Sequence, residues 1–312
     1  MTRERGPGVS PVRRPCAPAC LGTVADVDAA GLEQGPDAAA LRRGVLAVSV
    51  LHDVDVEPGP LGVVLPGAPS VWVSWDECRT ALDEADPESL PGRRRLLARL
   101  QARRWAADAG PAVLRAALVP AGLPVGHALH PGRDWVREHV LGGALDLGLA
   151  ATGLDPDDPD AVVLLPQPAL VAAGLDADAC WPAARTRLEQ LGEVAAERLR
   201  ADAGGVLRPC GPCDVVSLLG ARSLRAALAA CSGGMAAAVV PMRRRGWTRL
   251  ARVDTAFGPA AAAATDVADR GFPRPLLVTL DEVTVVAEGG RTTIALQDPV
   301  ASDPWARDVL YR

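Results

Sequence analysis

The stretch from Val140 to Leu154 constrains the fold most, because almost every residue in it is apolar or glycine. A segment without a polar face has to be buried by its neighbours. Pro131-Gly132 predicts a turn before it, and Asp134 is a suitable N-cap for a helix that begins at Trp135. The run of about fifteen residues contains Asp146, whereas a membrane span needs about twenty apolar residues. We therefore expect a buried core helix and no membrane anchor.

Three of the four histidines precede this stretch, at His127, His130 and His139. Imidazole is a common ligand of zinc, nickel and iron, so the three are candidate metal ligands. On the expected helix His139 and Asp146 share a face but lie two turns apart, roughly 10 Å at 1.5 Å per residue, and cannot bond directly. The alternative is a partly buried His and Asp, each satisfied by a backbone group or an arginine.

The chain contains no lysine, and this absence excludes whole classes of chemistry. Schiff-base mechanisms, including those of pyridoxal phosphate enzymes, need an ε-ammonium group, as do the phosphate loop of nucleotide triphosphatases and the protein kinases. Biotin and lipoyl carriers also need lysine and are excluded. Asparagine is absent too, and Ala, Gly, Pro, Arg, Val and Leu dominate. This usage is typical of proteins from high-GC bacteria.

The charge balance and the number of cysteines limit the possible partners and the cellular compartment. A net charge of −5 argues against a nucleic-acid partner. The first twenty residues carry arginines but no apolar core of a signal peptide. An odd number of cysteines, seven, does not indicate a disulfide scaffold in a chain of this length. We expect a soluble cytoplasmic protein.

Segments typical of strands alternate with segments typical of helices, and this order predicts an α/β fold with helices packed on a mixed sheet. We expect residues 1–40 to form a disordered or loosely packed arm. Residues 41–300 should form the α/β core, with a possible subdivision near 155, and residues 301–312 should form a tail. Expected strands lie at 45–51, 61–65, 71–73, 114–119, 161–165, 236–240, 276–280 and 283–286. Expected helices lie at 75–85, 86–108, 178–201, 222–231 and 260–264.

The sequence Cys210-Gly211-Pro212-Cys213 is similar to the dithiol of the thioredoxin family. The resemblance covers about 80 residues and includes Pro273 or Pro275 as the match of the family's cis-proline. It implies that Cys210 is a nucleophile with a depressed pKa at a helix N-terminus and that Cys213 resolves the mixed disulfide. The same two cysteines together with Cys16 and Cys20 are an alternative zinc set.

A basic segment follows the strand expected at 236–240. Arg243, Arg244 and Arg245 precede Trp247, and guanidinium groups beside an indole suit a phosphate, a carboxylate or a stacked base. These four residues are the candidate anion-binding site. The alternative is a basic turn paired with nearby aspartates.

The sequence contains no complete catalytic set. The Gly-x-Ser-x-Gly elbow and the Gly-x-Gly-x-x-Gly fingerprint are both missing. The best-supported hypothesis is a protein that binds a ligand, such as a small anion, or a protein partner. The alternative hypotheses are a thiol–disulfide oxidoreductase that uses Cys210 and Cys213, and a metal-dependent enzyme that uses the histidines with the acids at 53–57.

Overall fold

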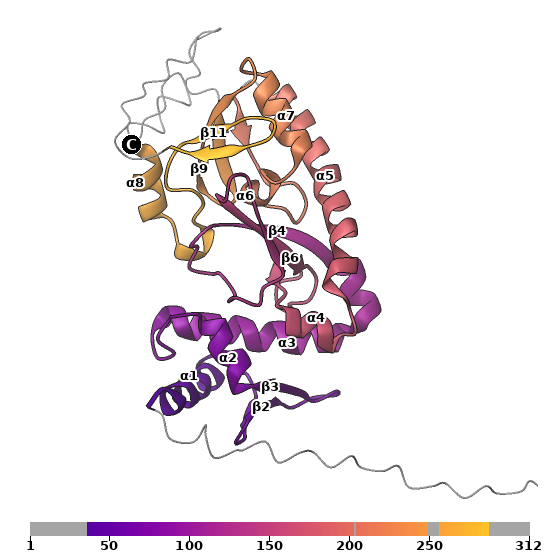
Figure 1. Cartoon of the computed structure of the whole chain (residues 1–312), viewed down its shortest axis with the longest axis vertical. Helices are drawn as coiled ribbons and strands as arrows, with labels where there is room; N and C mark the ends of the chain where they lie inside the picture. The colour runs from indigo at the N-terminus through magenta and orange to yellow at the C-terminus, as the bar shows by residue number, and fades with distance from the viewer. Residues whose placement is uncertain (1–35, 203, 249–255, 287–312) are drawn as a thin grey trace, which may run out of the picture.

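The computed structural model describes residues 36–202, 204–248 and 256–286 (Figure 1). The α/β class is confirmed. The described strands form three antiparallel sheets in place of one sheet of mixed direction. Figure 1 shows α1, α2, β2 and β3 at one end of the molecule, with α3 lying across between them and the central strands. Residues 36–40 of the expected arm belong to a helix, and the expected tail lies outside the described residues.

The first described element is the helix α1 (Pro36–His52), and the strand expected at 45–51 is therefore wrong. Leu41, Val45 and Val48 are buried and recur at helical spacing. Taken alone, the valine-rich run at 45–51 resembles a strand. The helical spacing becomes visible only when Leu41 is included, and two arginines separate Leu41 from the run. Tertiary packing overrides the weak strand preference of valine here.

The first sheet has the order β1-β2-β3 and packs with α1, α2 and the first half of α3 around one hydrophobic cluster. Ser74 ends β3 and caps α2, because its hydroxyl accepts a hydrogen bond from the backbone N–H of Glu77 at 3.0 Å. A side-chain oxygen at this position satisfies an otherwise unpaired N–H of the first helical turn. The elements are β1 (Glu57–Pro58), β2 (Gly62–Leu65), β3 (Val71–Ser74) and α2 (Trp75–Leu82).

The long helix α3 (Leu90–Ala117) begins after the N-cap Ser89 and is kinked at Gly110, which has φ 70° and precedes Pro111. The strand expected at 114–119 starts later, because the helix resumes after the kink. The strand that follows is β4 (Leu118–Pro124), and all of its residues are buried.

The central stretch forms a hairpin of two strands, so the buried helix expected at 135–154 is wrong. β5 (Arg137–Val140) and β6 (Leu145–Ala151) pair antiparallel. The turn between them contains Gly142 and Gly143 at φ 67° and 79°, which glycine adopts without strain. β6 lies between β4 and β5, and all of its residues are buried. A strand buried on both faces has the composition of a buried helix, so periodicity alone cannot separate them.

The chain then crosses the acidic turn at 155–160 and returns to the same core. β7 pairs with β6, and the long helix expected at 178–201 is confirmed as α5. One hydrophobic cluster contains residues of α3 and β6 from before the turn and of α4 and α5 from after it. The elements are β7 (Val163–Leu164), α4 (Gln167–Ala172) and α5 (Ala177–Ala201).

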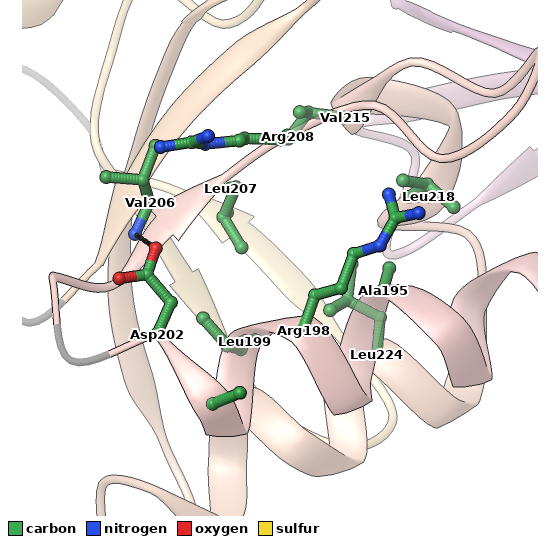
Figure 2. Close-up of a pocket in the computed structure, with 11 residues that line it drawn as sticks. Ala195, Arg198, Leu199, Asp202, Val206, Leu207, Arg208, Val215, Leu218 and Leu224 are labelled. Atoms are coloured by element: carbon green, nitrogen blue, oxygen red, sulfur yellow. Dashed lines mark hydrogen bonds between the residues drawn. The ribbon is translucent and has the colours of Figure 1, made fainter.

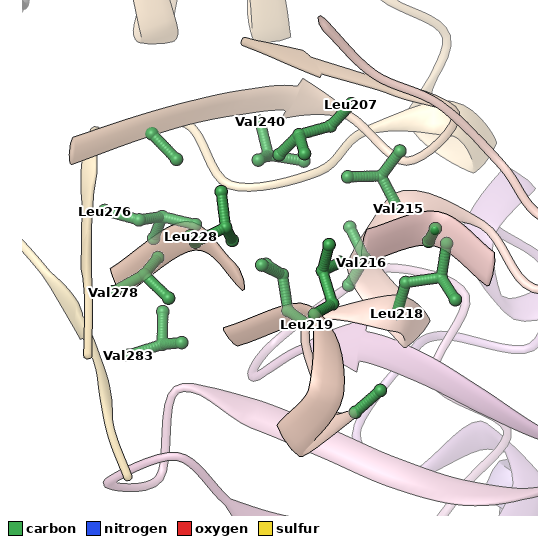
Figure 3. Close-up of a cluster of buried hydrophobic side chains, with 14 of the residues drawn as sticks. Leu207, Val215, Val216, Leu218, Leu219, Leu228, Val240, Leu276, Val278 and Val283 are labelled. Carbon is green, nitrogen blue, oxygen red and sulfur yellow. The ribbon is translucent and has the colours of Figure 1, made fainter. Parts of the chain in front are cut away.

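The C-terminal sheet has the order β12-β11-β9-β10-β8, and α6 and α7 pack on it. Figure 3 shows Leu207 and Val240 of the sheet facing Val215 and Leu219 across this cluster. The helix expected at 222–231, the strand at 236–240 and the hairpin at 276–286 are confirmed. The elements are β8 (Val206–Leu207), α6 (Val215–Leu218), α7 (Arg222–Ala230), β9 (Ala236–Met242), β10 (Arg245–Thr248), α8 (Phe257–Ala264), the 3₁₀-helix η2 (Val267–Asp269), β11 (Leu276–Val278) and β12 (Val283–Val285). Within the described ranges, no helix combines the length and the apolar composition needed to cross a membrane.

Candidate functional site

A pocket of about 500 Å³ lies between the C-terminal half of α5, β8, α6 and α7. Its volume is in the usual range of small-molecule sites. Its apolar wall consists of aliphatic side chains that these four elements turn toward one another (Figure 2). They are Ala195, Leu199, Ala201, Val206, Leu207, Val215, Leu218 and Leu224.

Three charged side chains also line this pocket: Arg198, Asp202 and Arg208. Figure 2 shows the two guanidinium groups on opposite sides of the pocket. Neither arginine forms an ion pair with any residue that the structure describes, and Arg198 makes only a long hydrogen bond of 3.4 Å to the carbonyl of Pro209. Asp202 accepts hydrogen bonds from the backbone N–H groups of Gly204 at 2.8 Å and Val206 at 3.4 Å. The charged lining therefore carries a net positive charge.

The CGPC segment forms the turn between β8 and α6, next to this pocket. The backbones of Cys210 and Cys213 exchange two hydrogen bonds, of 3.0 and 3.1 Å, and Gly211 supplies a positive φ of 54°. Both thiols are buried, and burial, together with the nearby Asp214 carboxylate, raises the pKa of Cys213 to about 12. The thioredoxin resemblance implies thiols activated at a helix N-terminus, whereas here the helix N-cap is Asp214. The turn therefore joins Arg208 and Val215, which both line the pocket.

The basic segment forms the tight turn of the β9–β10 hairpin, and its members have different environments. Nε and Nη2 of Arg243 each lie 2.7 Å from Oδ2 of Asp214, so this arginine ties the hairpin to the start of α6. Arg244 and Arg245 are exposed. The Arg245 guanidinium lies 5.6 Å from the centre of the Trp247 indole ring, as in a cation–π contact. Arg243 is thus engaged within the fold, while the other two face solvent.

His127 and His130 lie on the loop between β4 and β5, and both are buried. Nδ1 of His127 accepts from the N–H of Leu129 at 3.1 Å, and Nε2 lies 3.0 Å from the carbonyl of Arg270. His130 accepts from the N–H of Gly132 at 3.2 Å through Nδ1. Burial lowers the pKa of each imidazole to about 4. Both nitrogens of His127 are thus used by the backbone, which leaves no lone pair for a metal.

His139 lies directly opposite Asp146 in the β5–β6 hairpin. Nδ1 of His139 is 2.5 Å from Oδ1 of Asp146, so the expectation that these residues are too far apart to touch is wrong. Nε of Arg137 is 3.4 Å from Oδ1 of the same carboxylate, and Nε2 of His130 is 3.8 Å from Oδ2. Asp146 is 2% exposed, whereas the His139 side chain is 62% exposed. One buried carboxylate thus faces three basic side chains.

The predicted metal set is not gathered into one site. Within residues 36–202, 204–248 and 256–286, no group of three or more His, Cys, Asp or Glu side chains is arranged to hold a metal ion. The acids at 53–57 follow α1 at the end of the molecule away from the central hairpin (Figure 1). Cys16 and Cys20, of the alternative zinc set, lie outside the described residues.

Sequence reasoning missed both Arg198 and Arg208, because exposed arginines are ordinary on a helix and after a strand. It also missed the Arg137 and Asp146 contact, because that contact depends on the hairpin register. The signal available was the Gly-Gly pair at 142–143, which favours a turn over a continuous helix. Comparison with known proteins adds no assignment: no family model, no curated protein and no solved structure matches this chain.

Proposed function

We propose that this protein binds a small amphipathic anion, such as a carboxylate with an apolar body, in the pocket between α5 and β8. The observation that carries the proposal is the combination of an apolar pocket of about 500 Å³ with Arg198 and Arg208, which have no carboxylate partner among the described residues. Guanidinium groups bind carboxylates through charge-assisted hydrogen bonds. The aliphatic wall would bury the apolar body of the ligand.

The charge around the pocket supports an anion over a cation. Arg198 and Arg208 contribute two positive charges, and Asp202 contributes one negative charge that backbone N–H groups already stabilise. An ammonium ligand would meet two like charges, whereas a carboxylate would meet two opposite ones. Arg244 and Arg245 are also exposed, but their hairpin turn does not line this pocket.

The other two functions have less support from the geometry. Thiol exchange needs an accessible thiolate, whereas Cys210 and Cys213 are buried and burial raises the pKa of Cys213. A metal-dependent reaction needs a gathered ligand set, and the backbone already binds both ring nitrogens of His127.

The binding test is calorimetric titration of the full chain with decanoate. We expect Arg198→Ala and Arg208→Ala each to weaken binding about tenfold or more, the loss of one charge-assisted hydrogen bond. Arg200→Ala is the matched control, because Arg200 is exposed on the same helix and does not line the pocket. Its affinity should equal that of the wild type.

A cationic ligand with the same tail, decyltrimethylammonium, tests the role of charge. We expect it to bind much more weakly than decanoate. Arg244→Ala separates the pocket from the hairpin turn, since only a site at the turn would lose affinity in that variant. Equal decanoate affinity of the wild type, Arg198→Ala and Arg208→Ala would contradict the proposal.

A further inference from the structure

We propose that His139 and Asp146 form a general-base dyad, a reactive centre separate from the anion pocket, which activates water to hydrolyse a small carboxylic ester. The two residues are cross-strand partners in the β5–β6 hairpin. Nδ1 of His139 lies 2.5 Å from Oδ1 of Asp146. Asp146 is the positioning residue and His139 is the base.

The buried carboxylate sets the tautomer of the imidazole. A carboxylate beside one ring nitrogen favours the proton on that nitrogen and leaves the lone pair on the other. Asp146 faces Nδ1, so Nε2 of His139 carries the lone pair. Because the His139 side chain is 62% exposed while that of Asp146 is 3% exposed, the ring connects a buried charge to solvent.

Buried polar atoms without hydrogen-bond partners gather at this place. Among the described residues, His130 Nε2, Arg137 Nε and Asp146 Oδ1 make no hydrogen bond of good geometry. A buried polar atom without a partner has a free-energy cost that native proteins generally avoid. Asp146 Oδ1 nevertheless has the contact with His139 Nδ1 at 2.5 Å, whereas Arg137 Nε and His130 Nε2 reach the carboxylate only at 3.4 and 3.8 Å. The two unsatisfied nitrogens therefore point to a polar molecule beside this carboxylate.

The four histidines of the chain have different environments. His127 and His130 are buried, so their access to a substrate is restricted. His52 is exposed at the end of α1 and has no described carboxylate contact. His139 alone among them combines exposure with a contact to a buried carboxylate.

Hydrolysis of an ester needs a base that takes a proton from the attacking water and returns it to the leaving group. Nε2 of His139 would take a proton from water as the water oxygen attacks the carbonyl carbon of the ester. The bond from that carbon to the leaving oxygen then breaks, and the proton passes from Nε2 to the leaving oxygen. Ester and water are thereby converted to acid and alcohol, with no metal or redox partner required.

The first test measures the carbethoxylation of each histidine in the intact chain by diethyl pyrocarbonate, mapped by mass spectrometry. We expect His139 to react several-fold faster than His52, which serves as the exposed control within the same molecule. Asp146→Asn should reduce the rate at His139 to that at His52 and leave His52 unchanged. Equal rates at His139 and His52 in the wild type would overturn the proposal.

The second test measures hydrolysis of p-nitrophenyl acetate. We expect His139→Gln to lower the rate about tenfold or more, the usual contribution of a positioned base, while His52→Gln keeps the wild-type rate. Because His139 is exposed, its substitution leaves the core intact, so this test holds even if Asp146→Asn fails to fold. An unchanged rate in His139→Gln would refute the dyad. His139→Gln should leave the affinity for decanoate unchanged, so the failure of this proposal can be distinguished from the failure of the proposed anion binding in the pocket.

Discussion

At the residue scale, buried arginines connect the N-terminal part of the chain to its centre. Nη1 and Nη2 of Arg99 contact the two carboxylate oxygens of Asp134, and Nη2 also donates to the carbonyl of Pro131 at 3.0 Å. The Arg99 side chain is 1% exposed. Nε of Arg103 lies 3.0 Å from Oε1 of Glu77. Burial raises the pKa of Glu77, and the two guanidiniums oppose that effect. Arginines of α3 thus pair with acidic residues of α2 and of the loop before β5.

We predict that Asp134→Ala lowers the free energy of unfolding by about 3 kcal/mol, the lower end of the range for breaking a buried ion pair, because the buried Arg99 keeps only its longer contact with Glu77 at 3.5 Å. Denaturant unfolding followed by circular dichroism measures the change. Glu88→Ala is the control, since Glu88 pairs with Arg43 on the exposed surface and such pairs contribute little. A loss in Asp134→Ala no larger than that in Glu88→Ala would contradict the role assigned to Arg99.

At the element scale, the loop at 125–136 joins parts of the fold that are distant in the sequence. His127 contacts the carbonyl of Arg270 near the C-terminal sheet. The carbonyl of Pro131 accepts from Arg99 on α3. The conformation of the loop therefore depends on buried imidazoles, which are held by hydrogen bonds to the backbone and are predominantly neutral at neutral pH.

We predict that the protein loses stability as the pH falls from about 6.5 to about 4. Burial lowers the pKa of His127 and of His130 from 6.5 to about 4, so within this window the unfolded chain binds more protons than the folded chain. The free energy of unfolding therefore decreases with falling pH, and these two groups contribute no pH dependence above the window.

Urea unfolding at a series of pH values measures this slope. His130→Gln should reduce the slope of the unfolding free energy against pH by the equivalent of up to about one bound proton. His52→Gln should leave this slope unchanged, because His52 is exposed. Identical slopes in the wild type and His130→Gln would show that His130 is not the titrating group.

At the scale of the whole molecule, the hydrophobic clusters share elements. Leu147 of β6 belongs to the cluster under the C-terminal sheet, while Leu149 of the same strand belongs to the cluster with α3 and α4. In the same way, Leu100 and Ala102 of α3 belong to the N-terminal and central clusters. Elements shared between clusters couple their unfolding.

We therefore predict a single cooperative thermal transition for the described part of the chain. Differential scanning calorimetry should give one peak, with calorimetric and van't Hoff enthalpies that agree. The near-ultraviolet signal of the tryptophans and the far-ultraviolet helical signal should change together. Two separated transitions would show that a cluster folds independently.

The sequence by itself determined the α/β class and the elements with strong local signals. Ser74 marks a helix start because a side-chain oxygen caps backbone N–H groups in any context. The amphipathic pattern of α5 and the strands β9, β11 and β12 were predicted for the same reason, since local spacing and residue type were sufficient. The exclusion of lysine chemistry also needs only the sequence.

Only the tertiary structure decided the central hairpin, the helix α1 and the candidate sites. An apolar run such as Leu145–Ala151 is compatible with a helix or a strand, and the choice depends on the pairing of β4 and β5 with it. That pairing places His139 against Asp146. Arg198 and Arg208 line one pocket because α5 packs beside β8. Such contacts depend on the register and packing of distant segments, which no local pattern encodes.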